Sequence, residues 1–116
     1  MSGRRVVVTG MGAVTPLGNT VIETWKGLVE GKSGIGPIDT YDVSQYSTRF
    51  AGLIRNLDIT EYMSTKEARK IDPFIQYGLV AGIQAIRDCG LEIDDGNRGR
   101  IGVAIGSGIG GIGTIE

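Results

Sequence analysis

The sequence predicts an α/β fold with a parallel sheet, on three observations. Short apolar runs at 6–8 and 101–105 have the composition of buried strands. Helical patterns with capping signals lie between these two runs. The order strand, helix, helix, strand is typical of an α/β arrangement, in which helices connect parallel strands. We therefore expect one domain of 116 residues in which both runs are parallel strands.

The first strand is expected to end at Gly10, and a helix is expected to begin after Thr20. Thr20 and Glu23 have the spacing of a capping box, in which each side chain binds the other residue's backbone N–H. Apolar residues then repeat on one helical face, which predicts a helix that packs along that face: Val21, Ile22, Trp25, Leu28 and Val29. Gly31 is expected to end this helix.

The middle of the chain, 32–57, has scattered apolar residues among glycine and proline, which predicts irregular structure with a short strand near 50–54. Ser64 and Glu67 form a second capping-box pattern, which predicts a short helix. That helix is expected to stop near Ile71, because the following residue precedes a proline and is disfavoured in helical conformation.

A long helix is predicted over 74–88. Asp72 is a favourable N-cap, Pro73 is a favourable first helical residue, and Gly90 is placed to end the helix. Apolar residues on nearly every side of this helix predict that it is buried. One stripe of small residues would allow another backbone to approach closely: Gly78, Ala81, Gly82 and Ala85.

The charge balance and the apolar pattern exclude several classes of partner. Twelve basic and thirteen acidic residues give a formal net charge of −1, so the chain lacks the strongly basic surface of a generic nucleic-acid-binding protein. No apolar run approaches the ~20 residues that span a bilayer. The apolar run at the N-terminus is too short for a signal peptide, so we expect a cytoplasmic protein.

The sequence contains no histidine and a single cysteine, which narrows the chemistry that this chain can perform alone. A histidine general base, a catalytic triad and a histidine metal site are all excluded. Cys89 lies at the end of the long predicted helix, where the helix dipole opposes a thiolate. We expect Cys89 to be a small packing residue rather than a nucleophile, and we expect no metal site and no cofactor.

Twenty glycines concentrate at the edges of apolar segments. Residues 106–111 match the G-x-G-x-x-G pattern of dinucleotide sites, and residues 108–113 match it again. That site also needs a helix N-terminus for the pyrophosphate and an acidic residue about 20 positions further on, which the 116 residues do not include. A tight structural or substrate-lining loop is the favoured interpretation. An earlier candidate at 10–12 fails, because Thr15 replaces its third glycine.

Lys66, Arg69 and Lys70 are spaced i, i+3 and i+4 on the short helix after Ser64, so their side chains share one face. From spacing alone, an ordinary solvated face is favoured over a binding site, because Glu67 lies among them. An acidic partner would be needed to make this positive face a site.

Four segments closely resemble the β-ketoacyl-acyl carrier protein synthases, in particular their synthase II branch. They are R-R-V-V-V-T-G-M-G-A-V-T-P-L-G-N-T, W-K-G-L-V-E-G-K-S-G-I, K-E-A-R-K-I-D-P-F-I-Q-Y-G and I-G-V-A-I-G-S-G-I-G-G, in that order. The resemblance implies a thiolase-like layered αβαβα fold, of which 1–116 is the N-terminal part of the N-terminal domain. It also implies a cytoplasmic homodimer that performs a decarboxylative Claisen condensation in fatty-acid synthesis and needs no cofactor.

The resemblance places the family's catalytic cysteine and two histidines beyond the present sequence, and Cys89 does not match the family's Thr-Ala-Cys motif. No catalytic residue is therefore expected here, and the 116 residues alone are expected to be inactive and poorly folded. The resemblance does imply that Lys66, Arg69 and Lys70 dock acyl carrier protein, and that Ile109 gates the acyl pocket. Two alternatives stay open: a non-catalytic carrier-protein docking module, and a truncated nucleotide-binding domain.

Overall fold

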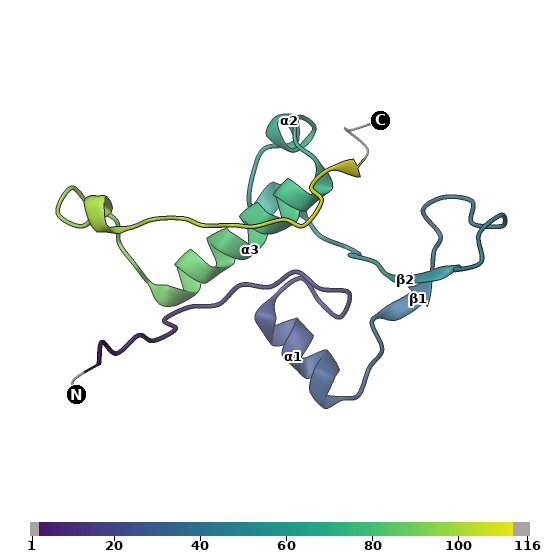
Figure 1. Cartoon of the computed structure of the whole chain (residues 1–116), viewed down its shortest axis with the longest axis horizontal. Coiled ribbons are helices and arrows are strands. Elements are labelled where there is room, and N and C mark those ends of the chain that lie inside the picture. The colour runs from purple at the N-terminus through teal and green to yellow at the C-terminus, as the bar shows by residue number, and fades with distance from the viewer. Residues whose placement is uncertain (1–2, 113–116) are drawn as a thin grey trace.

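The computed structural model describes residues 3–112, which form an open arrangement of helices and extended chain with one small sheet at its edge (Figure 1). The elements are α1 (Val21–Val29), β1 (Ile35–Pro37), β2 (Phe50–Gly52), α2 (Thr65–Ala68) and α3 (Pro73–Cys89), with 3₁₀ turns at Ile59–Glu61 and Arg98–Arg100. The radius of gyration is 17.6 Å. A compact domain of this length has a radius of about 13 Å. The chain is therefore much more open than an ordinary domain.

The capping signals placed the helices correctly. Thr20 Oγ1 accepts a hydrogen bond from the Glu23 N–H at 3.2 Å, and α1 begins after Thr20. The second half of the predicted capping box does not form, because the Glu23 carboxylate accepts the Asn19 N–H at 2.7 Å. Pro73 is the first residue of α3, and Gly90 ends that helix in the left-handed conformation with φ 62°. α2 ends at Ala68, somewhat before the expected limit at Ile71. These boundaries depend on local contacts, which explains why the sequence predicts them well.

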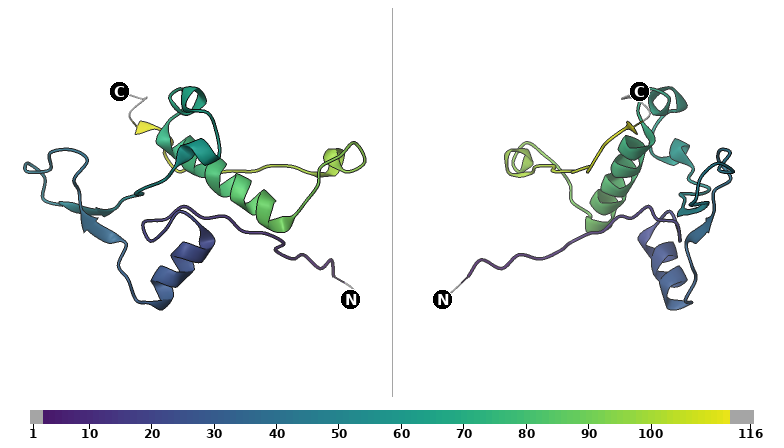
Figure 2. Two further views of the ribbon diagram at one scale, coloured as in Figure 1. Left: turned by 180° about the vertical axis from the view of Figure 1, so that it is seen from behind. Right: turned by 45° about the vertical axis from the view of Figure 1, so that its right-hand side comes forward.

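The predicted strands at 6–8 and 101–105 are wrong for the described structure, in which both segments run as extended chain without strand pairing. Val6 and Val8 are 89% and 80% exposed. Figures 1 and 2 show the N-terminal segment leaving the body of the molecule and the segment before the C-terminus running alone past α3. A strand forms only when its backbone N–H and C=O groups pair with a neighbour. Neither segment meets such a neighbour within residues 3–112.

The sheet that does form is an antiparallel pair, not the expected parallel arrangement. β1 pairs with β2 in the register Ile35↔Gly52, Gly36↔Ala51 and Pro37↔Phe50. The short strand predicted near 50–54 is confirmed by β2. The Arg55 guanidinium, beyond β2, binds the carboxylate of Asp39, which follows β1, at 2.9 and 3.1 Å on the exposed surface.

The prediction that α3 is buried is also wrong for the described part of the chain. Val80 is fully buried, but Phe74, Ile75, Leu79 and Ile86 are 37–43% exposed. The reason is that α3 is contacted along its length mainly by extended segments, which cover a helix less completely than a sheet or a second helix. Within residues 3–112, no helix is long and apolar enough to cross a membrane.

The stripe of small residues on α3 does admit close contact, as predicted. A Cβ atom placed on Gly12 would overlap the carbonyl oxygen of Ala81, so the N-terminal segment lies directly against the helix backbone. Further along the same stripe, Ile105 approaches Gly78, with its Cγ2 atom 3.7 Å from an ideal Cβ position there. α3 is thus the central element, and both extended segments lie against its small residues.

Candidate functional site

The short helix α2 is stabilised by its own capping box. The Ser64 hydroxyl accepts the Glu67 N–H at 3.2 Å, while Glu67 Oε2 accepts the Ser64 N–H at 3.1 Å and the Ser64 hydroxyl at 2.6 Å. The hydroxyl bond first, and then the backbone bond, lowers the pKa of Glu67 below its ordinary value. The Glu67 carboxylate is therefore directed to the start of the helix.

Lys66, Arg69 and Lys70, predicted as the functional face, are all exposed. Lys66 lies within α2, Arg69 is its C-cap, and Lys70 continues the turn through a 2.9 Å hydrogen bond from its N–H to the Glu67 carbonyl. None of the three forms a salt bridge with any group in the described part of the chain. The acidic neighbour that argued against a site is held by Ser64, which leaves three positive side chains on one exposed turn.

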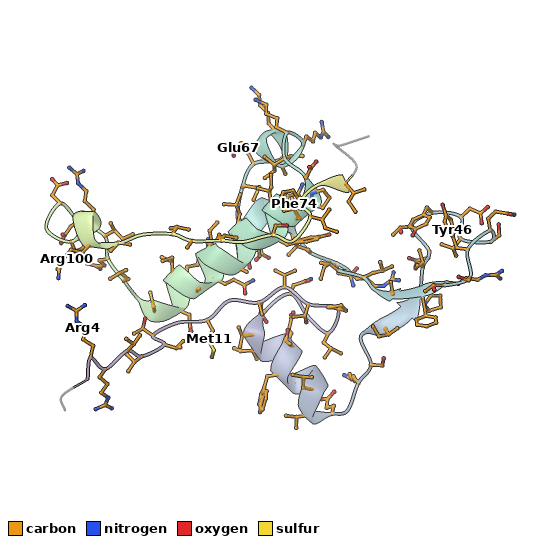
Figure 3. The ribbon with its side chains drawn as sticks, in the orientation of Figure 1. Arg4, Met11, Tyr46, Glu67, Phe74 and Arg100 are labelled. Atoms are coloured by element: carbon orange, nitrogen blue, oxygen red, sulfur yellow. The ribbon has the colours of Figure 1, made fainter. Side chains whose placement is uncertain are left out.

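A glutamine of α3 connects this basic turn to the long helix. Gln76 Nε2 donates to the carbonyl oxygens of Ala68 at 2.9 Å and Ile71 at 3.2 Å. Ala68 is itself buried. Figures 1 and 3 show α2 above the N-terminal end of α3. Sequence reasoning missed Gln76; the available signal was one polar residue in an otherwise apolar first half of the helix.

The glycine-rich loop passes the same end of α3. Gly110 adopts φ 79°, which favours glycine, and its N–H donates to the Ser107 hydroxyl at 3.1 Å. The Phe74 ring lies beside Gly110, with Cζ 3.6 Å from an ideal Cβ position on that residue. Ile109, the predicted gate, is 72% exposed.

An apolar groove of about 440 Å³ separates α3 from the start of this loop. Its walls are Phe74, Ile75, Gly78, Leu79, Ile105, Gly106 and Ser107. Ile109 does not line it. The structure therefore brings the basic turn, Phe74 and the glycine-rich loop to one end of α3, and it leaves Ile109 outside the neighbouring groove.

The dinucleotide interpretation loses its structural basis. That fingerprint requires a strand directly before the loop, and the segment at 101–105 is not a strand. The second match, 108–113, extends outside the described residues.

Cys89 is half-buried, its thiol donates to the Ile86 carbonyl at 3.2 Å, and its Cβ lies against Gly10. These contacts suit a packing residue. No cluster of metal-binding side chains occurs within residues 3–112.

Comparison with known proteins identifies the family to which the chain belongs. The family model described as "Beta-ketoacyl synthase, N-terminal domain" matches residues 3–116, which is nearly the whole chain. The chain belongs to this family. A solved structure described as "The ishigamide ketosynthase/chain length factor" aligns with a TM-score of 0.69 and 29% identity, over 77% of this chain and 22% of that one. The prediction that the chain is part of a thiolase-like fold is thereby confirmed, and the described residues form a partial α/β arrangement of it.

Curated relatives narrow the resemblance to one branch. The chain is 63% identical over 116 residues to a protein of Vibrio harveyi and 60% identical over 116 residues to one of Vibrio cholerae, both named 3-oxoacyl-[acyl-carrier-protein] synthase 2. A protein of the same name from Synechocystis is 47% identical over 113 residues. Each of the two Vibrio alignments covers all of this chain and 28% of the relative. The chain thus spans little more than a quarter of the length of these relatives.

Proposed function

We propose that this chain is the N-terminal part of a 3-oxoacyl-acyl carrier protein synthase of the synthase II branch, which elongates fatty-acyl chains. The observation that carries the proposal is the 63% identity that extends over all 116 residues to a relative of that name. The enzyme would work as a cytoplasmic homodimer. The non-catalytic docking module is the competing candidate.

The reaction has two steps in this proposal. A cysteine thiolate attacks the acyl thioester of acyl carrier protein, a new thioester forms, and the carrier thiol leaves. Malonyl-acyl carrier protein then loses carbon dioxide, and the electron pair of the broken C–C bond forms a new bond to the acyl carbonyl carbon as the cysteine sulfur leaves. The cysteine and the histidines for this chemistry belong to the rest of the enzyme, because these 116 residues contain no histidine and Cys89 is a packing residue.

An assay of the complete protein tests the enzyme against the docking module. Condensation of acyl-acyl carrier protein with malonyl-acyl carrier protein should release one carbon dioxide for each 3-oxoacyl product, whereas residues 1–116 expressed alone should be inactive. A folded complete protein that binds acyl carrier protein without condensation would favour the docking module. Turnover by residues 1–116 alone would contradict the assignment of chemistry to the rest of the enzyme.

Within this chain, the proposed roles are carrier-protein docking by Lys66, Arg69 and Lys70 and gating of the acyl pocket by Ile109. Three exposed cations on one turn provide long-range attraction to an acidic surface, such as the recognition helix of acyl carrier protein. A bulky apolar side chain among glycines is suited to move, because the glycines on both sides permit backbone changes.

Charge reversal tests the docking role. Lys66→Glu with Arg69→Glu should raise KM for acyl-acyl carrier protein by about tenfold or more, since like charges would face the acidic partner. The salt dependence of KM should become flatter. Turnover of a small acyl thioester without carrier protein should not change. Lys26→Glu, on the exposed surface of α1, is the matched control and should leave both substrates unaffected. An equal loss with both substrates would contradict docking.

A further inference from the structure

Phe74 is placed where α3 meets the loop that carries Ile109. It is the second residue of α3, it lines the apolar groove, and its ring lies beside Gly110, with Cζ 3.6 Å from the position that a Cβ would take there. Figure 3 labels Phe74 at this end of α3. Ser107, which also lines the groove, accepts the Gly110 N–H through its hydroxyl. Both interactions therefore act on Gly110, the residue that follows Ile109: the Phe74 ring lies beside it and the Ser107 hydroxyl accepts its N–H.

The Ile109 side chain is not packed against the groove. Its side chain is 72% exposed and lines none of the groove, so its position depends on the backbone between Ser107 and Gly110. That backbone contains one left-handed glycine, Gly110, whose conformation the Ser107 bond favours. The Phe74 ring lies beside Gly110 at this turn, and the Ser107 hydroxyl binds the Gly110 N–H. A displacement of Ile109 would therefore act against these two side chains.

We propose that Phe74 is a positioning residue that determines the preference for acyl-chain length by holding the loop of Ile109. This inference rests on the proposed gate function of Ile109. A chain too short to reach Ile109 reacts without displacing it, whereas a long chain must move the loop against the Phe74 ring. Loss of the ring should therefore favour long chains selectively. A residue needed only for folding would affect both chain lengths equally.

The test uses the complete synthase and compares kcat/KM for a long and a short acyl-acyl carrier protein. Phe74→Ala should raise the long-to-short ratio by about fivefold, the size of effect expected for contacting residues. Phe74→Tyr keeps the ring and adds a hydroxyl at Cζ, the ring atom nearest the Cβ position of Gly110, so it should hold the loop no less firmly and keep the parent ratio or lower it. Ile86→Ala is the control, on the same helix at 43% exposure but away from the loop, and should retain the parent ratio.

A double-mutant cycle with Ile109→Ala shows whether Phe74 acts through the gate. In the Ile109→Ala background, Phe74→Ala should change the ratio less than twofold, because no bulky side chain remains to be displaced. An unchanged ratio in Phe74→Ala, or the same change in both backgrounds, would overturn the inference. If Phe74→Ala does not fold, Phe74→Leu, which also removes the ring, replaces it and should shift the ratio in the same direction by a smaller factor; no shift would overturn the inference.

Ile109→Phe separates this inference from the proposed gate. It should lower kcat/KM for long chains more than for short ones, because it narrows the acyl pocket. If Ile109→Phe changes the ratio and Phe74→Ala does not, the gate stands and the role of Phe74 fails. If Ile109→Phe has no effect on the ratio, the gate itself fails and the role of Phe74 with it.

Discussion

Two glycine-containing segments lie against α3, and they are held in very different ways. Residues 10–13 are joined to the helix by side-chain hydrogen bonds: the Met11 N–H donates to Asp88 Oδ2 at 2.9 Å, and the Ala13 N–H donates to Gln84 Oε1 at 3.1 Å. Residues 102–107 have no backbone hydrogen bond to another part of the described chain. They approach α3 through Ile105 and the groove walls.

This difference shows that small residues permit a contact but do not by themselves complete it. Both segments use the same stripe on α3, yet the first, whose Met11 is labelled in Figure 3, also satisfies backbone donors with helix side chains. A buried backbone donor without a partner costs free energy, so side-chain acceptors allow the first segment to lie close. The second segment makes ordinary van der Waals contact and leaves its backbone donors exposed.

The largest expected effect on stability comes from adding a side chain at Gly12, where the first segment lies against the backbone of α3. Gly12→Ala would place its Cβ on the Ala81 carbonyl oxygen, and neither backbone can move without breaking hydrogen bonds. We expect a loss of about 3 kcal/mol or more in the free energy of unfolding. Denaturant unfolding of the complete protein measures it.

The matched control is Gly102→Ala in the open segment, where no atom lies within 4 Å of the ideal Cβ position. It should change stability by no more than about 0.5 kcal/mol. Equal effects of the two alanines would show that the complete protein packs both segments equally tightly, and the contrast between them would be lost.

Removal of the Gln84 side-chain hydrogen bonds should have an intermediate effect on the free energy of unfolding. Besides binding the Ala13 N–H, Gln84 donates to the Asn19 carbonyl at 2.7 Å and to the Tyr62 hydroxyl at 3.1 Å. Gln84→Leu keeps an apolar volume but leaves these groups unpaired, so we expect a loss of about 1–3 kcal/mol.

Gln84→Glu is the informative comparison for the same unfolding measurement. It retains an acceptor for the Ala13 N–H and loses the donor to the Asn19 carbonyl, so it should destabilise as well. A wild-type stability for Gln84→Leu would mean that close packing alone holds the first segment.

The smallest effect concerns α2, which is stabilised locally rather than by either segment. The Ser64 bonds lower the pKa of Glu67 below its ordinary value of 4.5 in the folded chain. Their stabilising contribution is therefore complete above that value and is lost as the pH falls through the lowered pKa. Glu67→Gln should have a slightly lower Tm than wild type at neutral pH, and the difference should vanish in acid. A Tm difference independent of pH would contradict this role of the carboxylate.

The sequence by itself determined the features that depend on neighbours along the chain. The capping residues Thr20, Ser64 and Gly90 located helix ends, because caps bind groups within a few residues. The i, i+3, i+4 spacing located the basic turn in the same way. The four segments that resemble the synthases predicted the family, since a family resemblance is itself a property of the sequence.

The tertiary structure alone decided which apolar segments were covered and which residues met at the end of α3. Apolar composition predicted strands at 6–8 and 101–105 and a buried α3, but pairing and burial require partners that lie far away in sequence. Phe74 and Gly110 lie side by side although they are 36 positions apart in the sequence, and no local pattern indicates this proximity. Local hydrogen bonds are therefore readable from sequence, whereas non-local contacts depend on where the folded chain brings its segments.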